Sequence, residues 1–428
     1  MYKNHQKRES INIIIYLSLI YIFLLLNYYF VISNKFGYAG FESSYFTLSK
    51  IFGAGFVTFY MIALTFFMKK NLYKIVYSIS LVLLYYGQSI FYIFNNTNFQ
   101  LVIYMTIPLL MIFILDKVDN NKYFKRKTIN IKDKYTRWLL VFVIILLMLP
   151  FFKYIKTVDL SNLLFLNIYE TRYLLREYDR GILGYIFSPL TRIFLPILFI
   201  YGITTKNKTL ILISFSSVIL MFLLNGAVKS VFFGIACAAF FVKGSYIQKE
   251  IRFLKYMLLV NVIAFVSYIT MGSILINDYM RRIIFVPASL FDTYYNYYLG
   301  NFTYFNHSKL YSLLGISDRE MPIGLFIGQF VLGKEGLNAN TGIFVEGFLS
   351  FGTIGVIIFS AFFALLIFII KKMDLDERYF GILFVYLYIV NTSFIETLLI
   401  THGLLFLMLS SAFLIPNSRS KDNPLRHK

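Results

Sequence analysis

Apolar stretches of about 20 residues, separated by short polar segments, recur along almost the whole of this chain. About 20 apolar residues in a helix cross a bilayer core about 30 Å thick, and these stretches are too long for the alternation of a membrane β-barrel. Only 14% of the 428 residues are charged, whereas a soluble protein has about 25%. The sequence therefore predicts an all-α polytopic membrane protein.

We expect about twelve transmembrane helices in a single membrane domain over residues 1–415. They should cover residues 11–33, 46–68, 72–94, 99–115, 138–156, 187–204, 209–225, 227–243, 256–276, 342–370, 379–395 and 397–415. The last two could instead form one re-entrant hairpin, because the turn at 391–396 is very short. Residues 157–186 should form a shorter outer segment, 277–341 a long outer loop, and 416–428 a basic cytoplasmic tail.

The distribution of positive charge predicts the orientation. Most of the 41 lysines and arginines lie in the N-terminal segment, in alternate short loops and in the C-terminal tail. Positive loops stay in the cytoplasm, so both termini should be cytoplasmic. The net charge of +20 is explained in this way and does not call for a nucleic-acid partner.

Two further features bound the protein class. The one cysteine, Cys237, lies in an apolar stretch, which excludes disulfides and Cys-rich metal sites. The stretch at 11–33 lacks a small-residue cleavage site, so we expect it to remain as a helix and not to be a signal peptide.

Three arginines stand out in the first outer segment. Arg172, Arg176 and Arg180 are spaced i, i+4, i+8 and share one face of a predicted helix. Like charges at this spacing cost about 0.2–0.5 kcal/mol per pair, so an anionic partner should offset them. That partner is either local (Glu170, Glu177 and Asp179, or lipid headgroups) or a phosphate gripped by the guanidinium groups.

Lys229 and Ser230 open the predicted helix 227–243 on the face where cations are otherwise scarce. Free N–H groups and the positive end of the helix dipole favour an anion at such a place. The alternative is that Lys229 only anchors the helix at the membrane boundary.

The long outer loop begins with Arg281 and Arg282, and Pro287 is expected to end their helical turn. Many aromatic residues follow, which either lie in the membrane interface or offer stacking platforms for sugar rings. They are Phe285, Phe291, Tyr294, Tyr295, Tyr297, Tyr298, Phe302, Tyr304 and Phe305. The titratable groups at the centre of the loop are His307, Asp318 and Glu320.

Glu346 should lie about one turn inside the boundary of the helix 342–370. A carboxylate there is costly and by default functional, unless it only pairs with one of the arginines. In the last hairpin, Glu396 is expected at the outer turn and His402 roughly two turns into the final helix. No Walker loop, H-E-x-x-H or G-x-S-x-G is present, and the only D-x-D, at 374–376, lies in a short cytoplasmic turn. We therefore expect neither a metal ion nor a cofactor.

Five motifs follow one another in the second half of the chain. They are G-x-x-K-S at 226–230, RR-x4-PA at 281–288, ANTG-x3-EG at 339–347, FG-x2-G at 351–355 and NTSF-x2-TLL-x-T-x-G at 391–403. This ordered set resembles the O-antigen polymerase family (Wzy, oligosaccharide repeat unit polymerases) over roughly residues 165–410. The first 150 residues resemble generic membrane helices.

The resemblance implies an inverting, metal-independent, processive glycosyltransferase of the GT-C-like type at the periplasmic face of the bacterial inner membrane. Donor and acceptor would be undecaprenyl-diphosphate-linked oligosaccharides within the membrane lipids. A chain-length regulator and a flippase would be protein partners. The two outer segments, 157–186 and 277–341, would then be periplasmic.

Site roles follow from this chemistry, because a departing lipid diphosphate develops negative charge that preorganised cations stabilise. We assign that role to Arg281, Arg282 and Lys229, and expect Arg172 and Arg176 to close over the second diphosphate. Glu346 is the first choice for the general base, and His402 or His307 the second. Arg180, Ser230, His307 and Asn340 complete the expected diphosphate- and substrate-binding set.

Two other activities fit the same composition. An O-antigen ligase, which joins the polymer to lipid A, would share the mechanism and the topology. A lipid-linked oligosaccharide flippase would also be basic with about twelve spans, but should show two related halves and charged residues deep in its helices.

Overall fold

The computed structural model describes residues 2–120, 122, 133–164, 166–177, 183–308, 311–312, 314–315 and 321–415. Every regular element in these residues is a helix, and they form no strand. Among them, 8 helices are long and apolar enough to cross a membrane. The protein is therefore an all-α, multi-pass membrane protein.

These 8 helices match eight of the expected spans. They are Glu9–Ala39, Leu48–Phe67, Leu72–Phe94, Phe99–Val118, Leu140–Thr157, Gly184–Thr204, Tyr246–Met271 and Ile343–Lys372. The other four expected spans coincide with shorter helices, Lys208–Leu224, Lys229–Phe241, Phe380–Ile389 and Leu404–Phe413. The total of about twelve spans stays a prediction.

The described chain divides into two compact units. Unit 1 comprises Met1–Asn120, Ser245–Phe368 and Leu387–Ile395. Unit 2 comprises Asn121–Gly244, Ile369–Tyr386 and Glu396–Lys428, so α18 and α19 each contribute to both units.

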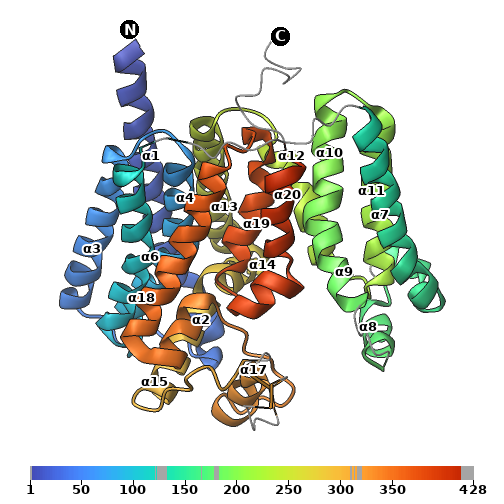
Figure 1. Cartoon of the computed structure of the whole chain (residues 1–428). Coiled ribbons are helices and arrows are strands. Elements are labelled where there is room, and N and C mark those ends of the chain that lie inside the picture. Colours follow the sequence, from blue (N-terminus) through green and yellow to red (C-terminus); the bar gives the residue numbers. More distant parts are fainter. Residues whose placement is uncertain are drawn as a thin grey trace. The chain divides into compact units, whose positions relative to one another are not determined.

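Unit 1 contains the N-terminal helices and the long loop (Figure 1). Its N-terminal part is built from α1 (Tyr2–Asn27), η1 (Tyr28–Ile32), α2 (Ser33–Phe36), η2 (Gly37–Ala39), α3 (Leu48–Phe67), α4 (Leu72–Ser80), η3 (Leu81–Tyr85), α5 (Tyr86–Phe94) and α6 (Phe99–Val118). Its second part is built from α13 (Tyr246–Met271), α14 (Leu275–Met280), η9 (Arg281–Phe285), α15 (Val286–Tyr298), α17 (Ile323–Phe326), η10 (Ile327–Val331) and α18 (Ile343–Lys372) as far as Phe368.

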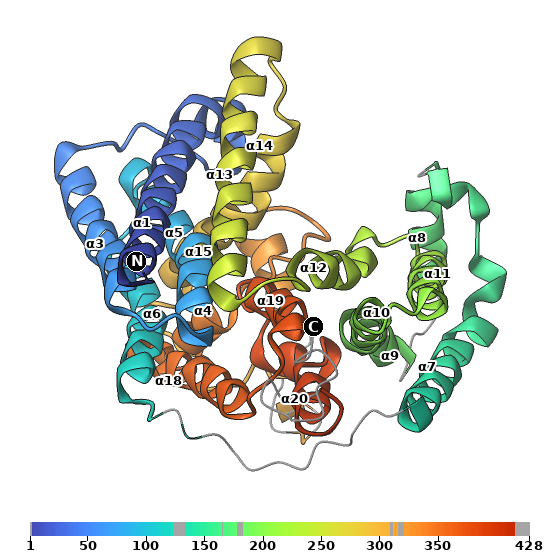
Figure 2. The ribbon, with the colours of Figure 1, turned by 90° about the horizontal axis from the view of Figure 1, so that it is seen from above.

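The continuous helix formed by α4, η3 and α5 is the centre of unit 1. In the stretch of this helix long enough to cross a membrane, 94% of the residues are buried. Helices α1, α3, α6 and α13 pack against it (Figure 2). Close approach is possible at Gly87, where an added Cβ would lie 2.1 Å from the carbonyl oxygen of Ile284. Helix starts in this unit carry polar caps: the Asn71 side chain accepts the backbone N–H of Tyr73 at 2.8 Å, and Asn98 accepts that of Gln100 at 2.9 Å.

The first part of unit 2 contains α7 (Asp133–Tyr154), η4 (Ile155–Thr157), η5 (Leu160–Leu164), α8 (Ile168–Glu177), α9 (Gly184–Pro189), η7 (Leu190–Phe194), α10 (Leu195–Thr204), α11 (Lys208–Leu224), η8 (Lys229–Phe232) and α12 (Phe233–Phe241). After the end of α18 come η11 (Glu377–Tyr379), α19 (Phe380–Ile389) as far as Tyr386, η12 (Thr397–Thr401) and α20 (Leu404–Phe413). Its apolar core joins α7, α10 and α11 through buried residues such as Val143, Leu198 and Met221.

Pro287 does not end the helical turn of Arg281 and Arg282, so that expectation is wrong. The helix runs on from α14 through η9 into α15 and ends at Tyr298. Proline disrupts a regular helix because it lacks an N–H and collides with the preceding turn. Here the wider π-helical turn η9 comes immediately before it, and Pro287 takes one of the first positions of α15, where a missing N–H costs nothing.

Candidate active site

The helix α18 is bent near its start. At Phe351 and Gly352 the backbone leaves the helical conformation, and Gly352 has a φ of 60° and a ψ of −140°. Gly347 and Gly355 then meet so closely that a Cβ on Gly355 would lie 1.8 Å from the Gly347 carbonyl oxygen. Residues 343–350 therefore fold back against the helix that follows, instead of extending it in a straight line.

Glu346 lies on this folded-back segment, and its side chain is only 2% exposed. Its Oε2 accepts the backbone N–H of Ile395 at 2.5 Å, and its Oε1 lies 3.4 Å from Nε2 of His307. A buried carboxylate is tolerated when it is hydrogen-bonded and paired. The contact with Ile395 supplies the hydrogen bond, and the contact with His307 supplies the partner. Glu346, the first choice for the general base, therefore lies next to His307, one of the two second choices.

His307 is held by a short segment of the long loop. Its ring is 1% exposed, and its Nδ1 lies 2.9 Å from the hydroxyl oxygen of Thr303. The backbone N–H groups of Thr303 and Tyr304 donate to the carbonyls of Leu349 and Ser350, at 2.8 and 3.1 Å. The bend in α18 frees these carbonyls, so the bend fixes the loop on which His307 lies.

Two residues of this segment have unusual backbone conformations. Tyr304 and Phe305 have φ values of 47° and 66°, in the left-handed region. This conformation costs about 1–2 kcal/mol for each non-glycine residue. Ring contacts offset the cost, because Phe305 lies 5.1 Å from Phe351 and 6.0 Å from His307 between ring centroids. Strain of this kind concentrates at functional sites.

Three of the motifs that carry the family resemblance meet at this pair within unit 1. Ile343, which follows the ANTG motif, donates its N–H to the carbonyl of Val390 at 3.1 Å. A Cβ on Gly342 would lie 2.5 Å from the same carbonyl oxygen. Phe394 of the NTSF motif packs edge-on against His307, at 5.3 Å between centroids. The FG-x2-G motif forms the bend itself.

Arg281 and Arg282 share one carboxylate, that of Asp278. Arg281 donates to Asp278 Oδ1 at 2.7 Å, and Arg282 lies 3.0 Å from Oδ2. The guanidinium group of Arg281 also stacks over the rings of Phe36 and Phe41, at 4.4 and 5.5 Å. Exposure separates the two arginines, since the side chain of Arg281 is 14% exposed and that of Arg282 is 67% exposed. Arg282 is therefore the more accessible of the two arginines.

Most of the aromatic residues of the loop are structural. Phe285, Phe291, Tyr294, Tyr295 and Tyr298 are buried in unit 1, and only Tyr297 and Tyr304 are largely exposed. Phe302 packs on Gly352 at the bend, where a Cβ would lie 2.6 Å from its ring.

A polar network that the sequence did not suggest lies beside these rings. Tyr295 donates to Gln100 Oε1 at 3.0 Å, and Asp292 accepts the hydroxyl of Thr97 at 2.5 Å. Burial raises the pKa of the Asp292 carboxyl, while the hydrogen bonds from Thr97 and Asn296 lower it.

Asn340 is exposed, and its side-chain oxygen faces α17, 3.2 Å from where a Cβ on Gly324 would lie. Asp318, Glu320 and Arg180 lie outside the described residues, as does the tail 416–428. The side chain of Arg176 is likewise not described, although its backbone belongs to α8.

In unit 2, Arg172 binds the loop that precedes Lys229. Its Nε and Nη2 donate to the carbonyls of Gly226 and Ala227, both at 3.2 Å. Gly226 (φ +69°) ends α11 in a Schellman motif, in which Ala227 N–H donates to Phe222 O at 2.9 Å. The structure thus brings Arg172 to the G-x-x-K-S motif, where Lys229 and Ser230 are exposed at the start of η8.

His402 also belongs to unit 2, and it lies at a helix break and not inside a continuous helix. It follows η12, and Gly403 with a φ of 83° separates it from α20. Its carbonyl accepts the hydroxyl of Tyr386 at 2.8 Å. Glu346, His307, Arg281, Arg282 and Asn340 therefore belong to one unit, and Arg172, Lys229, Ser230 and His402 to the other.

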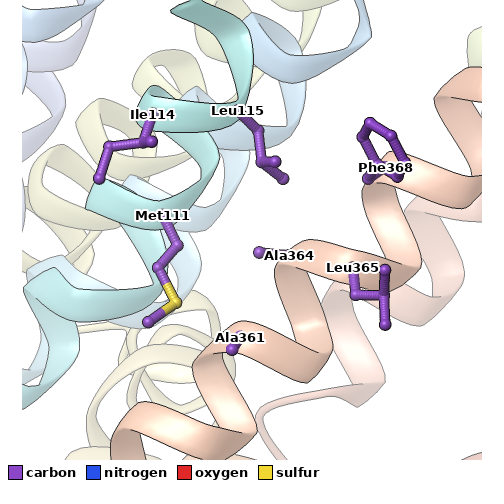
Figure 3. Close-up of a pocket in the computed structure, with 7 residues that line it drawn as sticks. All are labelled: Met111, Ile114, Leu115, Ala361, Ala364, Leu365 and Phe368. Carbon is purple, nitrogen blue, oxygen red and sulfur yellow. The ribbon is translucent and has the colours of Figure 1, made fainter. Parts of the chain in front are cut away.

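Two further features of the described residues bear on the site. No three His, Cys, Asp or Glu side chains among them gather as metal ligands would. An apolar pocket of about 380 Å³ lies between α6 and α18, lined by residues such as Met111, Leu115, Ala361 and Phe368 (Figure 3). Its lining carries no titratable group, so it is not a candidate for the chemistry.

The fold and the site define an all-α multi-pass membrane protein with a buried histidine–glutamate pair. No protein-family model, curated protein or solved structure matches the chain.

Proposed function

We propose that the protein is a surface-polysaccharide polymerase of the O-antigen polymerase kind, an inverting and metal-independent glycosyltransferase. The observation that carries the proposal is the buried Glu346–His307 pair. Glu346 belongs to the ANTG-x3-EG motif, Phe394 of the NTSF motif packs against His307, and the FG-x2-G motif forms the bend beside them. Motifs far apart in the sequence therefore gather around these two titratable groups.

The reaction would use the pair as its base. A hydroxyl of the acceptor oligosaccharide attacks the anomeric carbon of the donor and inverts it. The bond from that carbon to the diphosphate breaks, the new glycosidic bond forms, and the hydroxyl proton passes to the Glu346 carboxylate. The undecaprenyl diphosphate leaves with its negative charge, which the exposed guanidinium group of Arg282 in the same unit would stabilise.

The burial of the pair adds one requirement. With side chains only 1% and 2% exposed, the acceptor hydroxyl reaches Glu346 only when residues 302–307 move aside. Detachment would release the backbone strain of the left-handed Tyr304 and Phe305, which offsets part of the cost of breaking the ring contacts of Phe305 with Phe351 and His307.

The remaining expectations belong to this proposal. The chain would cross the bacterial inner membrane about twelve times with both termini in the cytoplasm, and the active face would be periplasmic. Undecaprenyl-diphosphate-linked donor and acceptor would enter from the membrane lipids, with a chain-length regulator and a flippase as partners.

Deletion of the gene tests the proposal. The surface polysaccharide of the deletion strain should show lipid A core capped with a single repeat unit and no ladder of longer polymers, and the intact gene should restore the ladder. Complete loss of capped core would contradict a polymerase and would indicate the ligase or the flippase instead.

A lipid-linked oligosaccharide flippase is the second candidate, because unit 1 buries charged side chains between its helices, in the first turns of α4 and α13. Lys74 and Glu250 are each 1% exposed, and Lys249 is fully buried. Buried charges of this kind mark transport pathways in membrane proteins. In the deletion strain a flippase would leave lipid-linked repeat units on the cytoplasmic face and no capped core.

A further inference from the structure

Thr303 is in contact with His307 in a way that limits where the imidazole proton can lie. Thr303 is 7% exposed, and its hydroxyl has two acceptors within reach: His307 Nδ1 at 2.9 Å and the Leu349 carbonyl oxygen, to which it can also donate, at 3.2 Å. That carbonyl already accepts the Thr303 backbone N–H at 2.8 Å. The single hydroxyl proton can therefore go to Nδ1, its nearer partner, without leaving the carbonyl unsatisfied.

If the Thr303 hydroxyl donates to Nδ1, the imidazole proton lies on Nε2, and the contacts of Nε2 on the other side of the ring favour the same tautomer. Nε2 faces Glu346 Oε1 at 3.4 Å, and the other oxygen of this carboxylate accepts the Ile395 N–H at 2.5 Å. An ionised carboxylate only accepts hydrogen bonds, so it favours a proton on Nε2. In the opposite tautomer, the lone pair of Nε2 would face a carboxylate oxygen. A neutral imidazole carries one ring proton, and the hydrogen bond made by one nitrogen determines whether the other nitrogen is protonated.

We infer that Thr303 is a positioning residue, which holds neutral His307 as the Nε2–H tautomer so that His307 donates to an ionised Glu346. The catalytic meaning of this inference rests on the proposed function, in which Glu346 takes the proton of the acceptor hydroxyl. The tautomer itself is a property of the folded chain and can be measured without any substrate.

The test is the ¹⁵N spectrum of the full chain, purified in lipid nanodiscs and labelled at histidine. The sequence has 4 histidines, so the His307 signals can be assigned by their loss in His307→Gln. At a pH where the ring is neutral, Nδ1 should give the shift of an acceptor nitrogen and Nε2 that of a protonated one. The reverse pattern in the unsubstituted protein would overturn the inference, and this measurement requires no variant of Thr303 to fold.

Two substitutions separate the hydroxyl from the packing. Thr303→Val keeps the shape and removes the hydroxyl, so the His307 signals should move toward a mixture of tautomers. Thr303→Ser keeps the hydroxyl and should retain the original pattern. Unchanged signals in Thr303→Val would contradict the role of Thr303.

Polymer ladders from cells distinguish this inference from the proposed function. Loss of a residue that orients a functional histidine typically lowers activity about 10–100-fold. Thr303→Val should therefore lower the amount of polymer by about this factor, and Thr303→Ser should restore it. If the tautomer is the expected one and Glu346→Gln still makes normal ladders, the proposed function fails and the inference about Thr303 stands.

Discussion

The carboxylate of Glu346 can be tested by a change of one atom. Glu346→Gln keeps the volume and an oxygen for the Ile395 N–H, but an amide does not take up a proton. The loss of a general base typically lowers the rate about 10²–10⁴-fold, so we expect no polymer ladder at normal expression. Glu335→Gln is the matched control, because Glu335 is exposed in the same loop. A normal ladder from Glu346→Gln would remove Glu346 from the mechanism.

The two arginines that share Asp278 should respond differently to substitution. Arg281 is stacked over Phe36 and Phe41 and mostly buried, so Arg281→Ala should lower the melting temperature of the purified protein by several degrees, for a loss of about 2–4 kcal/mol. Arg282 is largely exposed, and Arg282→Ala should leave the melting temperature nearly unchanged while weakening the polymer ladder. Equal melting temperatures for the two variants, or a full ladder from Arg282→Ala, would contradict these assignments.

The sequence located Glu346 because a carboxylate in an apolar stretch is costly and therefore conspicuous. It did not give the partner, since His307 lies 39 residues away and the contact depends on the bend in α18 and not on local spacing. The pairing of Asp278 with Arg281 and Arg282 was not predicted, although the sequence spacing indicates it. Asp278 stands three and four residues before Arg281 and Arg282, the spacing at which helical ion pairs form.

At the scale of the element, the bend in α18 should depend on the absence of a side chain at Gly355. Gly355→Ala would place a Cβ 1.8 Å from the Gly347 carbonyl oxygen, which forces the two segments apart and displaces Glu346. We expect a loss of about 1–3 kcal/mol or more in stability, together with loss of the polymer ladder.

Gly55→Ala is the control for that substitution. Gly55 lies in α3 with no atom within 4 Å of an added Cβ, so alanine there should be neutral or stabilise the helix by up to about 1 kcal/mol. Both proteins can be compared by thermal unfolding in detergent. Similar melting temperatures would show that the close approach at Gly347 is not required.

The contact between α4 and α13 provides a second test at this scale. Lys74 and Glu250 are both 1% exposed and attract each other without a direct hydrogen bond, and Glu250 accepts the hydroxyl of Ser78 at 2.6 Å. Removing one member of a buried charge pair typically costs about 3–5 kcal/mol, whereas replacing both by apolar residues is often neutral. Glu250→Leu should therefore lower the melting temperature markedly, and adding Lys74→Met should restore most of it. Additive losses in the double variant would show that the two charges do not depend on each other.

The sequence predicted the helix positions well, because a stretch of about 20 apolar residues in a membrane forms its backbone hydrogen bonds most readily as a helix. The π-helical turns and the bend at Phe351 and Gly352 did not follow, because they depend on contacts between elements. Gly342, Gly347, Gly352 and Gly355 predict close packing at this helix end but not a break in the helix, yet the φ of 60° at Gly352 and the ring of Phe302 against it make the bend. Pro287 was misinterpreted for the same reason, since η9 accommodates it.

At the scale of the whole molecule, the element order separates two kinds of polar groups in unit 1. The first turns of α4 and α13, which contain Lys74 and Glu250, lie at the end of unit 1 where α1 begins, and the segment between α15 and α17 lies at the opposite end (Figure 1). The cation-rich connection between α3 and α4, with Lys69 and Lys70, lies at the same end of unit 1 as Lys74. An orientation that places the N-terminus in the cytoplasm therefore places Glu346 and His307 on the outer side, as the proposed function requires.

Labelling of single cysteines tests that orientation. Cys237 is 5% exposed and can be replaced by alanine to give a cysteine-free background. Glu335→Cys and Thr205→Cys, each introduced alone, place a thiol at exposed positions of the long loop and of the short connection between α10 and α11. A membrane-impermeant maleimide applied to spheroplasts should label Glu335→Cys at once and Thr205→Cys only after lysis. Because the positive-inside rule fixes both positions together, the reverse pattern would invert the whole topology and place the Glu346–His307 pair on the cytoplasmic side, where the proposed polymerase could not work.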